Sequence, residues 1–209
     1  SGKTLTKTFV RSILLLLLGG CSLYAPFGAF AQVLDSTFYL GMKARSIGPA
    51  GMSGRVAAIT SVPENPDIIY VGAATGGVWK SINRGTTWQP VFDTQNTSSI
   101  GAIACFSGNP NTVWVGTGEG NVRNSAGVGR GVFKSLDGGK TWKSMGLEKT
   151  ERIHRVILHP TNPDVAWVAA MGTTWGENAE RGVFKTTDGG KTWRKTLFVD
   201  NKTGCAELA

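Results

Sequence analysis

Two short stretches of the sequence carry residues that could bind phosphate. Gly138-Gly139-Lys140-Thr141 and Gly189-Gly190-Lys191-Thr192 both end like a phosphate-binding loop. That loop requires a further glycine five positions before the glycine that precedes the lysine, and it opens a helix. Lys134 and Lys185 occupy the required positions, and a strand-like Thr-Trp pair follows each stretch. The spacing therefore excludes a nucleotide site and indicates a turn.

Two glycine-rich loops hold the other side chains that could do chemistry. They read TGEGNVRNSAGVGRG at 117–131 and MGTTWGENAERG at 171–182. Arginines can bond carboxylates, and a tryptophan can stack on a sugar or a peptide. The same residues could instead form salt bridges between loops, and both interpretations stay open. The candidate ligand-binding residues are Glu119, Arg123, Arg130, Trp175, Glu177 and Arg181.

Neither catalytic residues nor a metal site can be assigned from the sequence. A glycosidase needs two positioned carboxylates, and the loops give no evident pair. His154 and His159 lie five positions apart on an expected strand, so they would face opposite sides. We therefore predict no metal, no cofactor and no activity of this chain on its own.

The turn that resembles a phosphate loop recurs along the chain. SINRGTTW occupies 81–88, SLDGGKTW occupies 135–142 and TTDGGKTW occupies 186–193. Each copy has an upstream Asn-Pro anchor, at 65–66, 109–110 and 162–163. Apolar runs lie before and after each anchor, so every unit reads as four short strands. A repeat of about 50 residues with four strands is the size of a propeller blade.

The repeat predicts an all-β fold, a β-propeller of about three four-stranded blades with the start of a fourth. We expect blades at about 55–93, 100–147 and 153–200, a fourth from near Gly204, and a lead-in at 32–54. Alternating strand direction places the loops between second and third strands at one rim, together with the links between blades. The recurring turns then lie at the opposite rim.

The recurring turn has a structural explanation. Asp137 and Asp188 can accept hydrogen bonds from backbone amides a few residues on, and Asn83 can do the same in the first copy. An amide in place of the acid suits a turn better than a catalytic carboxylate. Each turn ends at a tryptophan that can be buried between sheets. The structural residues of the three turns are Asn83, Trp88, Asp137, Trp142, Asp188 and Trp193.

Residues 1–31 have the order of a secretory signal peptide. Lys3, Lys7 and Arg11 precede an apolar run that is too short for a membrane span, and Ala29-Phe30-Ala31 forms a cleavage site. Cys21 stands in a lipoprotein-like Leu-Gly-Gly-Cys setting, so a lipid anchor is the alternative. We predict export to the periplasm or beyond, with no membrane span.

The charge and the cysteines limit the possible partners. The net charge is +8, of which the leader's three basic residues account for three, leaving +5. This charge is spread along the chain, whereas a nucleic-acid site requires a clustered basic stripe. Cys105 and Cys205 lie too far apart to suggest a disulfide framework.

The turns and the runs around them resemble a known group of proteins. The pattern S-x-D-x-G-x-T-W is similar to the Asp-box, or BNR repeat. RSIGPAGMSGRVAAI at 45–59, GAATGGVWKS at 72–81 and RGVFKTTDGGKTW at 181–193 resemble the N-terminal part of exported bacterial proteins with sortilin-like Asp-box repeats. Many of these proteins are labelled glycosyl hydrolases. The resemblance covers 41–209 and implies further blades of a parent protein as partners.

The resemblance implies two alternative functions. One is a recognition or scaffold module for a peptide or glycan. The other is the N-terminal part of a sialidase-like or xyloglucanase-like hydrolase whose catalytic carboxylates lie outside 1–209. Xyloglucan-cleaving relatives have an acid before the Gly-Gly of the first blade, and Ala74 takes that place here.

Overall fold

The computed structural model describes residues 55–121 and 123–209, which belong to one compact unit, Pro49–Ala209. The predicted signal peptide at 1–31, with Cys21, and the lead-in at 32–54 lie outside the described residues.

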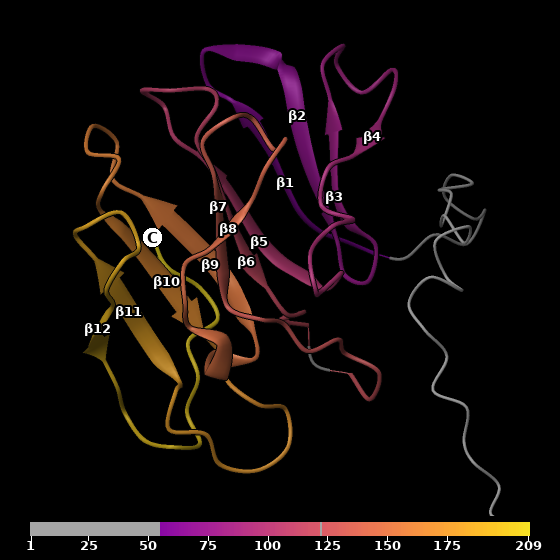
Figure 1. The fold of residues 1–209 in the computed structure, drawn as a ribbon. Coiled ribbons are helices and arrows are strands. Elements are labelled where there is room, and N and C mark those ends of the chain that lie inside the picture. Colours follow the sequence, from indigo (N-terminus) through magenta and orange to yellow (C-terminus); the bar gives the residue numbers. More distant parts are fainter. Residues whose placement is uncertain (1–54, 122) are drawn as a thin grey trace, which may run out of the picture. The chain divides into compact units, whose positions relative to one another are not determined.

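The described residues form three four-stranded antiparallel sheets, which Figure 1 shows in chain order. The strands of the first sheet are β1 (Val56–Val62), β2 (Asn65–Ala73), β3 (Gly77–Ser81) and β4 (Gln89–Pro90). Those of the second are β5 (Ile100–Cys105), β6 (Val113–Thr117), β7 (Val132–Ser135) and β8 (Lys143–Ser144). Those of the third are β9 (Ile153–Leu158), β10 (Ala166–Ala170), β11 (Gly182–Thr186) and β12 (Arg194–Leu197). A 3₁₀ turn, Glu148–Thr150, links the second sheet to the third.

Each sheet is a meander in which strands follow one another in sequence order. The first strands of the three sheets lie side by side, because β5 packs against both β1 and β9. This arrangement is that of propeller blades around an axis. The predicted fold class, an incomplete β-propeller of three blades, is confirmed. We refer to the sheets as blades 1, 2 and 3.

The hydrophobic core lies between the blades. One cluster joins blades 1 and 2 through residues such as Tyr70, Phe92 and Phe133, and a second joins blades 2 and 3 around Trp114 and Ile153. Strands covered on both faces explain why the apolar runs are nearly continuous in the sequence.

Glycines on the second strands permit this close packing of blades. A Cβ atom at Gly72 would lie 2.5 Å from Ile100, and one at Gly116 would lie 2.4 Å from Ile153. Because these contacts are too short for any side chain, glycine is required at the same position of both blades.

The Asn-Pro anchors lie between the first and second strands of blades 2 and 3 and at the start of β2 in blade 1. In each anchor the asparagine side chain accepts a hydrogen bond from the backbone amide two residues on, at 2.9–3.2 Å. Such a side-chain bond closes a turn locally, which is why the sequence signal was readable. The bonded pairs are Asn65 with Asp67, Asn109 with Asn111, and Asn162 with Asp164.

Candidate ligand-binding site

The recurring turns gather at one edge of the blades, which we call the box rim (81–88, 135–142 and 186–193). In every blade the box turn donates a backbone hydrogen bond to the residue that follows the Asn-Pro anchor. The three bonds join Arg84 to Asp67, Gly138 to Asn111, and Gly189 to Asp164.

The opposite edge is formed by the loops between second and third strands and by the links between blades. We call it the loop rim (92–99, 118–121, 123–131, 146–152 and 171–181). Gly118 and Gly77 donate backbone hydrogen bonds to Ser99 and Ser98 of the first link, and Gly129 donates to Glu151 of the second. Loops and links therefore share one edge, as the alternation of strand direction predicts.

The box turn uses its acid for the fold. Asp137 accepts the backbone amide of Thr141 at 2.9 Å and its hydroxyl at 2.6 Å, while buried Ser135 accepts the amide of Gly139 at 2.8 Å. The hydrogen bonds from Thr141 lower the pKa of Asp137 to about 2. Asp188 is bonded in the same way by Thr192, which lowers its pKa too.

The first box turn keeps this geometry without a charge. Asn83 accepts the amide of Thr87 at 2.9 Å and donates from its own side-chain amide to the Thr87 hydroxyl at 2.9 Å. Because an amide and an acid make the same bonds at this position, the side chain stabilises the turn and needs no charge. This observation supports the structural role predicted for the turn.

Two of the candidate ligand-binding residues have side chains that are buried within the loop rim. Glu119 is 1% exposed and forms an ion pair with Arg55, the residue before β1. Arg181 is 9% exposed and donates to four backbone carbonyls, those of Met171, Thr173, Gly176 and Asn201. A guanidinium bonded to four carbonyl oxygens holds its loop in shape and leaves little for a ligand.

Arg152 is a buried residue of the loop rim that the sequence analysis missed. It lies just before β9, is 6% exposed, and donates to Gly172 at 3.3 Å and to Ala126 at 3.5 Å. It thereby joins the two long loops. Burial lowers the pKa of its guanidinium. The sequence did carry a signal for Arg152, because Arg55 stands at the same place in the repeat, directly before the first strand of its blade.

Three other candidate residues lie at the surface of the long loops. Trp175 is 71% exposed. The exposed Arg123 donates to the nearby hydroxyl of Ser125, at 2.7–3.0 Å. Glu177 pairs with Lys202 at 3.5 Å. The structure does not bring these three side chains together with Glu119 or with one another through any bond among the described residues.

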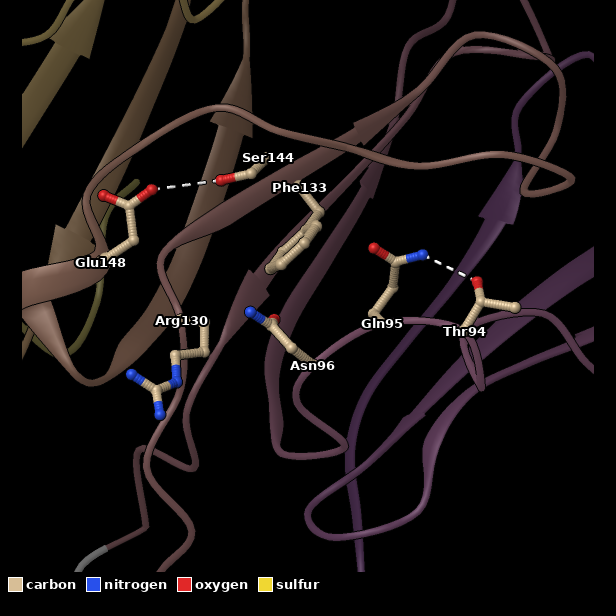
Figure 2. A pocket seen from close by; sticks show the side chains of 7 residues that line it. All are labelled: Thr94, Gln95, Asn96, Arg130, Phe133, Ser144 and Glu148. Carbon is tan, nitrogen blue, oxygen red and sulfur yellow. Dashed lines mark hydrogen bonds between the residues drawn. The ribbon is translucent and has the colours of Figure 1, made fainter. Parts of the chain in front are cut away.

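The sixth candidate, Arg130, lines a hollow of about 440 Å³ at the loop rim (Figure 2). Blade 1 contributes the link that follows β4, and blade 2 contributes the start of β7, the end of β8 and the 3₁₀ turn. In the described part of the chain, no side-chain hydrogen bond or ion pair involves the Arg130 guanidinium. The hollow is lined by Thr94, Gln95, Asn96, Arg130, Phe133, Ser144 and Glu148.

The lining supplies both donors and acceptors. Gln95 donates to Thr94 at 2.8 Å, which leaves its carbonyl oxygen as an acceptor, and Ser144 donates to Glu148 at 3.2 Å. Asn96 adds an amide and Arg130 a charged donor. Amides, hydroxyls and one ion of each sign can bond a ligand that carries hydroxyl, carbonyl or carboxylate groups.

The described residues hold no group of three histidines, cysteines or acids that could bind a metal ion. None of the helices in this same part of the chain is long and apolar enough to cross a membrane.

No protein-family model matches the sequence, and no curated protein matches it. Solved structures do resemble the fold. An ancestral GH74 enzyme is similar with a TM-score of 0.56 and 24% identity, over 73% of this chain and 19% of that one. The GH74 xyloglucanase from Xanthomonas campestris gives 0.52 and 18%, over 72% and 22%. YCF48 bound to D1 peptide gives 0.50 and 14%, over 70% and 42%.

These similarities concern the fold, which they identify as part of a β-propeller. The chain spans about a fifth of the two GH74 enzymes and less than half of YCF48. They give no family-level support for a sortilin-like protein, so that resemblance remains an interpretation of the sequence motifs.

Proposed function

We propose that this chain is part of an exported recognition or scaffold protein that binds a peptide or a glycan at its loop rim. The observation that carries the proposal is the hollow around Arg130. Its guanidinium is unpaired among the described residues, and side chains that offer both donors and acceptors line the same hollow. The acids of the box rim, by contrast, are bonded within their own turns.

The proposed site uses only part of the predicted set. Arg130 makes the main contact, and the exposed Arg123 and Trp175 extend the surface along the same rim. Glu119 and Arg181 are buried and stabilise the loops from within. Two propellers of similar fold are compatible with a peptide or a glycan as the ligand. YCF48 is bound to a D1 peptide, and the Xanthomonas enzyme is a xyloglucanase.

Binding to arrays of oligosaccharides and of peptides tests the proposal. We expect the chain to retain members of one array, and Arg130→Ser with Asn96→Ala to lose them. The matched control is Lys140→Ser with Asn111→Ala, which removes similar groups from the box-rim edge. If the control variant loses the ligand and the Arg130 variant still binds it, the site lies at the box rim and the proposal is wrong.

Glycoside hydrolysis is the second candidate, and Glu119 is the observation in its favour. This carboxylate is buried at the loop rim beside Arg55. Hydrolysis requires two carboxylates, however, and the hollow around Arg130 contributes only Glu148. Ala74 is 2% exposed and offers no proton at the position where the xyloglucan-cleaving pattern has an acid.

We therefore expect the purified chain to release no sugar from a panel of oligosaccharides that includes xyloglucan fragments. Release that Glu119→Gln abolishes, with unchanged folding, would favour the hydrolase instead.

A further inference from the structure

Blades 2 and 3 each have an arginine just before their third strand. These residues are Arg130 and Arg181, and Gly-Val-Phe follows each of them in the sequence. Arg181 shows what a guanidinium at this place can bind, because the four oxygens that it bonds are main-chain carbonyls. Three of them belong to the loop of the same blade and the fourth to Asn201. In blade 3 the protein's own main chain therefore surrounds this guanidinium.

A lysine of blade 3 also bonds the main chain at this place. Lys195 on β12 is paired in the sheet with Phe184, and its ammonium lies 5.2 Å from the Phe184 ring. The ammonium donates to the main-chain carbonyl of Ala179 and lies 3.8 Å from the carboxylate of Glu180. The Lys195 side chain therefore lies over the phenylalanine and joins the outer strand to the loop.

Blade 2 has a serine at the place of that lysine. Ser144 on β8 is paired with Phe133, as Lys195 is with Phe184. A serine is too short to lie over the ring, and the hollow of about 440 Å³ is lined by both members of this pair (Figure 2). Arg130 lines the same hollow, and in the described part of the chain its guanidinium has no carbonyl partner. Blade 2 thus has an open hollow where blade 3 is filled by its own chain.

We propose that this hollow binds an extended peptide through main-chain carbonyl oxygens, and neither a free carboxylate nor a sugar. This inference rests on the binding site proposed above and names its ligand. Arg130 donates to carbonyls of the peptide as Arg181 does to those of its own loop. The occupant follows from the comparison of the two blades, because main-chain carbonyls are what the cations of blade 3 bond at the same place.

The other residues of the hollow suit the main chain of a peptide. β8 is the last strand in the sheet of blade 2, so its outer edge has no neighbouring strand among the described residues. A peptide beside a free strand edge gains affinity from main-chain hydrogen bonds. Gln95 and Asn96, from the link that follows β4, add side-chain amides that can bond both the N–H and the C=O groups of such a peptide.

A sugar fits the hollow less well. The aromatic residue of its lining is Phe133, which is 4% exposed and stands edge-on to Phe92, with ring centroids 5.2 Å apart. A buried ring offers no face on which a sugar can stack.

The test compares three sets of immobilised probes. They are short acetylated and amidated peptides without aspartate or glutamate, the same peptides with one glutamate each, and neutral oligosaccharides. We expect the chain to bind members of the acid-free set as tightly as their glutamate versions, and free acetate should not compete. A thioamide, which is a weaker acceptor, should weaken binding at one position of the tightest peptide. Arg130→Ser should remove the sensitivity to that thioamide.

Ser144→Lys copies blade 3 and tests the hollow itself. The new side chain should lie over Phe133 and fill the hollow, so binding should weaken about tenfold or more while thermal unfolding stays the same. The matched control is Thr187→Lys, which adds the same charge at an exposed residue of a box turn and should bind as the unchanged chain does.

Two kinds of result would overturn the proposal. If binding requires the glutamate, if acetate displaces the peptide, or if only oligosaccharides bind, the ligand is of another class, and the loop rim remains the binding face. If Ser144→Lys binds as tightly as Thr187→Lys, or if no probe binds, the proposed function fails together with this inference.

Discussion

The two rims of this partial propeller are built on opposite principles. At the box rim, all three blades make the same bonds, with the side chain at position 83, 137 or 188 bonded within its own turn. At the loop rim the blades differ, because the second-to-third strand loop is short in blade 1 and long in blades 2 and 3. Bonds that are repeated in every blade indicate residues that stabilise the fold. Loops that differ between blades indicate where a repeat protein can bind a specific ligand.

The charged groups follow the same division. Acids at the box rim are bonded by hydroxyls and amides of their own turns. The loop rim has buried ions that are bonded and, among the described residues, a guanidinium without a partner. Arg181 and Arg130 illustrate the two kinds: the first bonds four carbonyls, and the second faces a hollow. A guanidinium in a loop can therefore hold the loop or serve a ligand, and only its contacts distinguish the two.

The largest expected effect is on the box rim. Trp142 packs edge-on against Phe92 and donates to the Val91 carbonyl at 2.6 Å. Trp142→Ala should lower the free energy of unfolding by about 3–4 kcal/mol, because it removes a ring and a bond between blades. Denaturant unfolding measures the loss. The matched control is Trp88→Ala, since Trp88 is 38% exposed; an equal loss in both variants would contradict the account of blade packing.

A smaller effect is expected at the loop rim. Arg181→Ala removes four bonds to carbonyls and should lower the free energy of unfolding by about 2 kcal/mol. It should also speed proteolytic cleavage within 171–181. Arg123→Ala, in an exposed loop, should leave both measurements unchanged. If the two variants behave alike, Arg181 does not hold its loop and becomes a ligand candidate again.

The pH dependence of stability should come from the box rim. The folded-state pKa of Asp137 is about 2 and that of Asp188 is also lowered, both below the ordinary value of 3.8. Their stabilising contribution is therefore complete above pH 4 and is lost as the pH falls toward 2. The thermal midpoint should drop over this range. Asp137→Asn with Asp188→Asn, which copies Asn83, should flatten the drop; an unchanged acid profile would show that other groups are responsible.

The box rim was predictable from the sequence because its bonds are local. Ser135, Asp137 and Thr141 bond one another within one turn, so their spacing carries the whole signal. The three-fold recurrence of that turn then gave the fold, because a unit of four short strands has few ways to cover both faces.

The candidate site was only partly predictable because distant segments assemble it. Asn96 and Glu148 lie more than one blade apart in sequence and line the same hollow. No sequence motif indicates that these two residues come together. Arg130 was found from its glycine-rich loop, but burial of Glu119 and Arg181 depends on how the loops fold around backbone carbonyls. Residue type alone does not carry that information.

The loop rim, and not the box rim, is the binding face proposed for this chain. The most direct test is a titration of the strongest array ligand with two paired variants of equal charge change. Arg123→Ser with Arg130→Ser should weaken binding about tenfold or more, because a bond from arginine to a ligand anion or carbonyl is worth about 1.5–3 kcal/mol. Lys140→Ser with Lys191→Ser should leave the dissociation constant unchanged. Loss of binding in the lysine pair, with full binding in the arginine pair, would contradict the claim.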